Sequence, residues 1–136
     1  MIAVDASALV AIATGEHDFE RFEAALLSAT DAVVGPIAVY EATLAIARKR
    51  SIEPALAEAR VYRILTAFGI RGVAMGPDIA AIALEANARF GKGRHPAGLN
   101  MGDCFAYALA KAHGAALLFK GDDFVKTDIA AAVESP

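Results

Sequence analysis

The sequence predicts an α/β fold in which a mainly parallel sheet of four or five strands is flanked by helices. Short apolar runs alternate along the chain with longer segments of helical periodicity, and this alternation is typical of a parallel sheet built from strand–helix units. The runs are mainly apolar rather than alternately polar, as expected of strands that are buried on both faces. Helices are therefore expected on both sides of the sheet.

Four runs are predicted to form the strands. They are residues 1–4, 32–34, 70–74 and 115–119. The first run ends at Asp5, and the second is followed by Gly35 and Pro36. In a parallel sheet the carboxyl ends of the strands lie along one edge, so the residues that follow the runs are expected to meet there.

Six segments are predicted to be helices. They are residues 8–13, 17–28, 37–47, 53–68, 78–90 and a helix that begins after Asn100 and ends at Gly114. Pro36 and Pro77 suit the start of a helix, because their fixed φ is already helical. The helix over 37–47 holds one charged residue, Glu41, and is expected to be largely buried. With 53–68 it is expected to form a hairpin that offers an apolar groove to a partner.

Length and composition limit the class of protein. A chain of 136 residues, of which 57% are hydrophobic, is expected to form one domain over residues 1–136. Its net charge of −3 provides no global basic field, so nucleic acid would have to meet a local basic patch. The N-terminus lacks the basic residues of a signal peptide, and no run is long enough to span a membrane. The single cysteine, Cys104, fits a reducing compartment, and we expect a cytoplasmic protein without a membrane partner.

Isolated carboxylates mark a candidate site. Asp5 follows the first predicted strand, and Asp122, with Asp123 beside it, follows the last. Glu41 and Asp103 lie on helices, near enough to the helix starts to point at the same edge of the sheet. Structural alternatives stay open, because Asp5 and Asp103 could be helix-capping residues and Asp122 a turn residue. Glu41 could pair with a buried arginine or tyrosine.

A cluster of carboxylates predicts a hard divalent cation, because close like charges raise one another's pKa and a cation relieves their repulsion. Oxygen ligands suit Mg²⁺, with Mn²⁺ as an alternative, and the lack of a His/Cys constellation argues against zinc. The chemistry that such a site serves best is the attack of metal-activated water on a phosphodiester. Cys104 is interpreted as a small buried residue rather than a nucleophile.

Two groups of cations are candidates for contact with an RNA backbone. The glycine-rich stretch 91–98 carries Lys92 and Arg94 and is predicted to be a loop that leads into the last helix. Arg48 and Arg50 lie at the end of the third predicted helix, where cations also favour the helix dipole.

Several stretches resemble the PIN-domain toxins of VapC type. They are residues 2–9, the apolar helix around Glu41, residues 99–110, and residues 117–124 followed by 127–129. The most specific part is the pattern Asn-x-Gly-Asp-Cys-x-x-Tyr-Ala from Asn100, with the later Gly-Asp-Asp-Phe, and the likeness covers essentially the whole chain. It implies a PIN-like α/β/α sandwich and Mg²⁺- or Mn²⁺-dependent endoribonuclease activity. It also implies that the chain is the toxin of a VapBC-type toxin–antitoxin pair.

The resemblance assigns roles by motif position. The places of the family's core acids are taken by Asp5, Glu41 and Asp103. The fourth and most variable place is taken by Asp122, with the adjacent Asp123 as the alternative, and with Asp5 and Asp103 this acid would hold the metal. Ser7 matches a small hydroxyl residue near the metal, and Asn100 a residue that supports the acids. Glu41 would hold a metal-bound water or a second metal and would help to deprotonate the attacking water.

The resemblance also implies partners. These are an RNA substrate, a VapB-type antitoxin and a second copy of the chain in a homodimer, with DNA bound only through the antitoxin. The antitoxin's C-terminal segment would lie over the helical hairpin and reach into the acidic pocket.

Two other functions compete with this one. A metal-dependent phosphatase would use Asp5 as a nucleophile, but its familiar form places a second aspartate two residues later, where this chain has Ser7. A catalytically silent PIN-like scaffold would bind RNA or protein without cutting, and the four intact acids argue against it.

Overall fold

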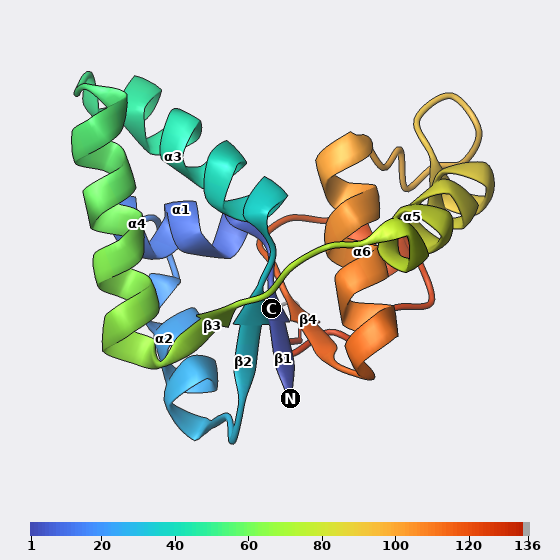
Figure 1. Cartoon of the computed structure of the whole chain (residues 1–136), viewed down its shortest axis with the longest axis horizontal. Coiled ribbons are helices and arrows are strands. Elements are labelled where there is room, and N and C mark those ends of the chain that lie inside the picture. The colour runs from blue at the N-terminus through green and yellow to red at the C-terminus, as the bar shows by residue number, and fades with distance from the viewer. Residues whose placement is uncertain (135–136) are drawn as a thin grey trace.

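A short parallel sheet forms the centre of the structure, a computed structural model that describes residues 1–134. Its strands are β1 (Ile2–Val4), β2 (Ala32–Val34), β3 (Ile70–Gly72) and β4 (Ala116–Leu118). They lie in the order β3-β2-β1-β4, and all neighbours are parallel (Figure 1). One further parallel bridge joins Leu117 to Ala131 beyond β4. The predicted α/β fold with a parallel sheet is confirmed.

Within residues 1–134, six helices surround this sheet, as predicted. They are α1 (Ala6–Thr14), α2 (Phe19–Ser28), α3 (Pro36–Arg50), α4 (Pro54–Phe68), α5 (Pro77–Phe90) and α6 (Met101–His113), followed by a 3₁₀ turn, η1 (Phe124–Lys126). Proline occupies the first turn of α3, α4 and α5, as its fixed φ favours. Gly114 ends α6 in the left-handed conformation, with φ of 60°. Helix α1 begins two residues earlier than predicted, because Asp5 is its N-cap.

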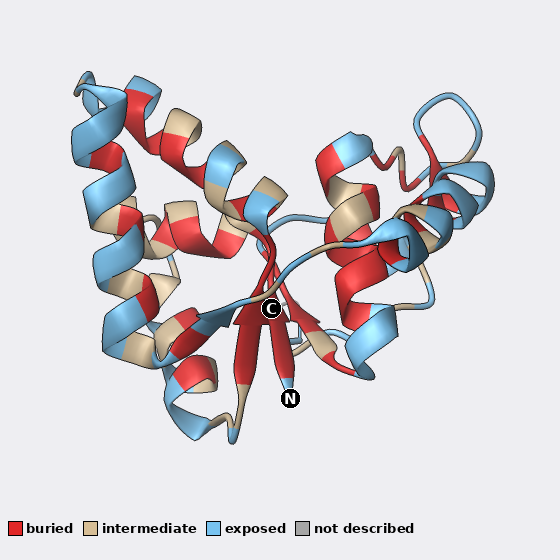
Figure 2. Cartoon of the chain, viewed as in Figure 1, coloured by how far each residue is buried: buried red, intermediate tan, exposed pale blue. Residues whose placement is uncertain are grey.

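The helices form two layers, one on each face of the sheet. Successive strand residues point to opposite faces, so Val4, Val34 and Leu118 join one apolar cluster with residues of α1 to α4. The opposite face presents Ala3, Val33 and Leu117 to a second cluster with residues of α5 and α6. Figure 2 shows β1, β2 and most of β4 buried between the two layers, whereas β3, at the edge of the sheet, is exposed at Arg71 and Gly72. This explains why β1, β2 and β4 are apolar at consecutive positions.

The carboxyl end of the sheet carries the residues that matter for function. The Asp5 N–H donates to the Leu118 carbonyl at 2.9 Å, so the chain after β1 lies beside the chain after β4. Helices α3 and α4 form the predicted hairpin (Figure 1). A groove of about 720 Å³ runs along it, with the exposed Tyr40 and Tyr62 among its lining residues. Within residues 1–134, none of the helices is long and apolar enough to cross a membrane.

Candidate active site

Asp5 is the most deeply buried acid of the described chain, with only 6% of its surface exposed. As the N-cap of α1, its Oδ2 accepts hydrogen bonds from the Ser7 N–H at 3.0 Å and from the Ser7 hydroxyl. Burial raises the pKa of Asp5, and the bonds from Ser7 oppose this rise. Asp5 thus caps helix α1 and also belongs to the candidate site.

Glu41 lies on α3 and faces the first turn of α6. An added Cβ at Gly102 would overlap the Glu41 carboxylate, so the Glu41 side chain keeps this position only beside glycine. Burial raises the pKa of Glu41, and the charges of Asp5 and Asp103 raise it further. Glu41 forms no hydrogen bond or ion pair within residues 1–134, so the alternative of a buried arginine or tyrosine partner does not apply.

Asp103 is held at the start of α6 by a reciprocal capping box. The Asp103 N–H donates to Asn100 Oδ1 at 2.9 Å, and the Asn100 N–H donates to Asp103 Oδ2 at 3.1 Å. Burial raises the pKa of Asp103 to about 6, to which the charges of Asp5 and Asp123 add, while the bond from Asn100 lowers it. The predicted N-cap at Asn100 is confirmed, and this residue orients the Asp103 carboxylate.

The two acids after β4 lie in different surroundings. Asp123 is the one whose charge raises the pKa of Asp103. Asp122 instead lines a separate hollow beside His17 and Arg21. The structure thus brings Asp123 into the electrostatic field of the other acids, whereas the motif position had favoured Asp122.

The donor set fits a divalent cation. Beyond the effect of burial, the charge of Asp5 raises the pKa of both Glu41 and Asp103, and none of these three acids forms an ion pair within the described chain. A doubly charged cation is the partner that would relieve this repulsion. As placed, no three His, Cys, Asp or Glu side chains of residues 1–134 are close enough to hold a metal ion together. The carboxylates therefore converge on one region without forming a closed cage.

The cations predicted to contact RNA are all exposed, and one of them forms a hydrogen bond within the protein. Lys92 and Arg94 are exposed on the loop between α5 and α6, and their side chains make no hydrogen bond or ion pair to the rest of the described chain. Arg48 is also exposed. Arg50 instead donates from Nη2 to the Thr14 carbonyl at 2.6 Å and so holds the end of α1.

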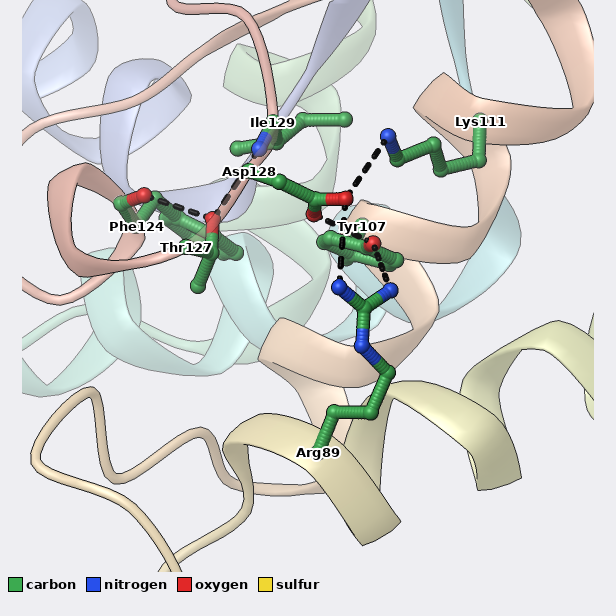
Figure 3. Close-up of polar contacts among 7 residues, drawn as sticks. All are labelled: Arg89, Tyr107, Lys111, Phe124, Thr127, Asp128 and Ile129. Atoms are coloured by element: carbon green, nitrogen blue, oxygen red, sulfur yellow. Dashed lines mark hydrogen bonds and ion pairs between the residues drawn. The ribbon is translucent and has the colours of Figure 1, made fainter.

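A polar cluster on α5 and α6 fixes the segment that follows Asp123. The Tyr107 hydroxyl donates to Asp128 Oδ1 at 2.6 Å, and Arg89 and Lys111 each approach Asp128 Oδ2 at 3.4 Å (Figure 3). The sequence motif contained Tyr107 and Asp128, but sequence reasoning gave them no role. Their contact ties the end of the chain to the helix that carries Asp103.

Sequence reasoning also missed the role of Gly102. The available signal was a glycine within the first turn of a helix, a position that costs helix stability without a packing or functional reason. Cys104 is buried, as predicted.

Comparison with known proteins identifies the type of chain that carries these residues. Residues 2–130 match the family model of the PIN domain. The chain is 45% identical over 129 residues to ribonuclease VapC30 of Mycobacterium tuberculosis, covering 95% of this chain and 96% of the relative. It is 46% identical over 131 residues to ribonuclease VapC of Mycolicibacterium smegmatis, covering 96% and 98% of the two chains.

Solved structures share the fold. The crystal structure of M. tuberculosis VapC20, described as a sarcin–ricin loop cleaving toxin, superposes with a TM-score of 0.77 over 99% of this chain and all of the other, at 17% identity. A chain of a toxin–antitoxin complex from Klebsiella pneumoniae gives a TM-score of 0.69 at 16% identity, over 99% and 100% of the two chains.

Proposed function

The chain belongs to the PIN-domain family and is a VapC-type ribonuclease, and we propose that it hydrolyses RNA at the carboxylate cluster of Asp5, Glu41 and Asp103. The observation that carries this proposal is the closeness of these acids without an ion-pair partner within residues 1–134. Beyond the effect of burial, the charges of Asp5 and Asp103 raise the pKa of Glu41, and the charge of Asp5 raises the pKa of Asp103. Such a set of charges is favourable when a divalent cation is bound. VapC ribonucleases are generally metal-dependent, and we propose Mg²⁺, with Mn²⁺ as a substitute.

Asp5 and Asp103 are the residues that would hold the cation. Asp5 is oriented by Ser7 and Asp103 by Asn100, so each carboxylate has its direction fixed by a hydrogen bond that leaves other lone pairs free. Asp123 is the third candidate, because its charge acts on Asp103. When bound, the cation supplies a Lewis acid that stabilises charge on the phosphoryl oxygens.

Glu41 is proposed as the general base. Its raised pKa brings it closer to the range in which a carboxylate accepts a proton, and its carboxylate lies against Gly102 at the start of α6. Glu41 would take a proton from the water that attacks phosphorus in line. The bond from phosphorus to the 3′ oxygen breaks, and this oxygen takes a proton from solvent, which leaves a 5′-phosphate and a 3′-hydroxyl.

The chain is the toxin of a VapBC-type pair, and its partner is an antitoxin. We propose that the antitoxin occupies the groove along α3 and α4, which is close to Glu41 and presents Tyr40 and Tyr62. A homodimer, a single domain over residues 1–136 and a cytoplasmic location remain predictions.

Cleavage of total RNA tests the proposed function. Purified wild type should yield discrete fragments with Mg²⁺ or Mn²⁺ and none with EDTA, and Asp103→Asn should yield none under any condition. Asp78→Asn is the matched control, because Asp78 is also an acid in the first turn of a helix but is exposed on α5. Equal cleavage by wild type and Asp103→Asn would show that the carboxylate cluster is not the catalytic site. No cleavage by folded, antitoxin-free wild type with either metal would favour the silent scaffold.

A further inference from the structure

A second hollow, of about 650 Å³, lies beside the carboxylate cluster. Ser7 and Glu41 form part of its lining, so it is continuous with the proposed catalytic site. The rest of its polar lining comes from Tyr40 and Arg48 on α3, Glu16 after α1 and Lys120 after β4. We call these six residues and the space between them the flanking hollow. Its volume is in the usual range of ligand sites, about 300–1,000 Å³.

Two cations, Arg48 and Lys120, line the flanking hollow. Lys120 Nζ lies 2.8 Å from Glu16 Oε2 and donates to the His17 carbonyl at 3.2 Å, and Lys49 Nζ pairs with the other oxygen of Glu16. The Glu16 carboxylate therefore pairs with two ammonium groups, although Lys49 does not line the hollow. Arg48 is exposed and forms no ion pair within the described chain. A phosphate group in the hollow would meet the charges of Arg48 and Lys120.

Lys120 is fixed relative to the catalytic acids. The Lys120 N–H donates to Ser7 Oγ at 3.0 Å, and the same hydroxyl donates its own proton to Asp5. The Ser7 hydroxyl therefore joins the backbone after β4 to the acid after β1. A phosphate bound by Lys120 would consequently lie at a defined position relative to Asp5.

Tyr40 provides an aromatic surface at the same place. Its side chain is 66% exposed although it precedes Glu41 directly on α3, and it lines both the flanking hollow and the groove along α4. Exposed aromatic rings next to cations are the usual platform for unstacked RNA bases, because every base offers a face for stacking. The groove along α4 presents Tyr62 but neither Arg48 nor Lys120.

We propose that the flanking hollow binds the nucleotide next to the scissile phosphate, with its phosphate on Arg48 and Lys120 and its base on Tyr40. This inference rests on the proposed function for the position of the scissile phosphate. Single-stranded RNA is favoured over an antitoxin segment as the occupant, because cations and an exposed ring combine here beside the catalytic acids. The groove along α4, with fewer cations and more apolar residues, suits a peptide better.

Equilibrium binding of RNA tests the proposal independently of cleavage. The probe is a short, fluorescein-labelled single-stranded RNA of mixed sequence, titrated with antitoxin-free protein in EDTA at several salt concentrations. The variants are Arg48→Gln, Lys120→Gln and Tyr40→Leu. Their controls are Arg63→Gln, Lys126→Gln and, for Tyr40→Leu, Leu84→Ala, which alter exposed residues outside the flanking hollow.

We expect each of the three variants to weaken binding about fivefold or more, since stacking and phosphate contacts each contribute on that scale. Loss of a phosphate contact should also lower the slope of log K against log salt by about 0.7, whereas Tyr40→Leu should leave the slope unchanged. Lys120→Arg should restore binding, which separates the charge from a structural role of Lys120.

Three outcomes would overturn the proposal. The first is binding of RNA by the three variants that equals binding by their controls, and the second is no binding of RNA by wild type at low salt. The third is normal RNA binding by the variants with loss of binding to the cognate antitoxin, which would assign the hollow to that peptide. Failure of the proposed function is distinguishable, because it appears as metal-independent cleavage, or as cleavage by Asp103→Asn, whatever the EDTA titrations show.

Discussion

The hydroxyl of Tyr107, on α6, donates a 2.6 Å hydrogen bond to Oδ1 of Asp128, on the segment that follows η1. Tyr107 is 3% exposed, so this bond replaces water for a buried hydroxyl and joins the end of the chain to α6. Arg89 and Lys111 neutralise the second oxygen of Asp128 (Figure 3). The contact therefore holds the segment that carries Asp123 against the helix that carries Asp103.

Tyr107→Phe should lower the free energy of unfolding by about 1–2 kcal/mol, because the bond to a charged acceptor is lost while the ring is kept. Denaturant unfolding measures this change. Thr66→Val, an exposed hydroxyl on α4, is the control and should change stability by less than about 0.5 kcal/mol. A Tyr107→Phe protein as stable as wild type would show that the bond contributes nothing.

The same contact predicts a pH dependence at both ends of the scale. Hydrogen bonding to Tyr107, followed by Lys111 and Arg89, lowers the pKa of Asp128, so its contribution to stability is present above the ordinary aspartate pKa and is lost as pH falls below it. Burial and then Asp128 raise the pKa of Tyr107 to about 12. The unfolded chain therefore loses this proton first, and stability should fall as pH rises from about 10 towards 12. Unfolding of wild type and Tyr107→Phe across these ranges should show a difference that shrinks at both extremes.

Asp103→Asn should stabilise the metal-free protein at pH 7. Burial and the charges of Asp5 and Asp123 raise the pKa of Asp103 to about 6, so at pH 7 the residue is ionised although its surroundings disfavour the charge. Asparagine keeps an oxygen that can accept from the Asn100 N–H, so the cap survives while the charge is removed. We expect a gain of about 1–2 kcal/mol in EDTA, after allowance for solvent screening at this partly exposed group. The gain should disappear near pH 4, where wild type is also neutral, and a loss of stability at pH 7 would contradict the proposed repulsion.

A divalent cation should stabilise wild type but not a variant that lacks the carboxylates of Asp5 and Asp103. Binding to the native state raises the free energy of unfolding by about 2.7 kcal/mol at a cation concentration of 100 times Kd, equivalent to several degrees in Tm. Thermal unfolding with Mg²⁺, Mn²⁺ or EDTA measures this effect. Asp5→Asn/Asp103→Asn should show no increase in Tm, whereas Asp78→Asn should behave like wild type. An equal increase in all three proteins would place cation binding elsewhere.

Gly102→Ala should impair cleavage without unfolding the protein. The added Cβ would displace the Glu41 carboxylate, whose side chain is free to rotate away, and alanine favours the helix by up to about 1 kcal/mol. We expect at least a tenfold loss of cleavage with unchanged or increased stability. Ala112→Gly, on the exposed part of α6, makes the reverse change away from the site and should lower stability without affecting cleavage. Full activity of Gly102→Ala would show that cleavage does not require the Glu41 carboxylate to lie beside residue 102.

The fourth acid can be identified by a matched pair. Asp123→Asn should reduce cleavage, because Asp123 is the acid whose charge reaches Asp103. Asp122→Asn, one residue earlier, should leave cleavage within about twofold of wild type. The opposite result would restore the assignment that the motif position favoured.

The sequence alone determined the elements of the fold and most of the site. Apolar runs without alternation predicted buried parallel strands, and the prolines and Gly114 predicted where helices begin or end, because these signals act within a few residues of the chain. Asp5, Glu41 and Asp103 stood out because an isolated charge in an apolar segment is costly without a purpose. Local chemistry was sufficient for these predictions.

Only the tertiary structure decided which side chains meet. The overlap between Glu41 and an added Cβ at Gly102 depends on how α3 lies against α6. The hydrogen bond from Lys120 to Ser7, which links Lys120 to Asp5, joins residues 113 positions apart. The choice between Asp122 and Asp123 depends on the direction in which the loop after β4 turns. These relationships arise from packing between distant segments, which no local pattern in the sequence specifies.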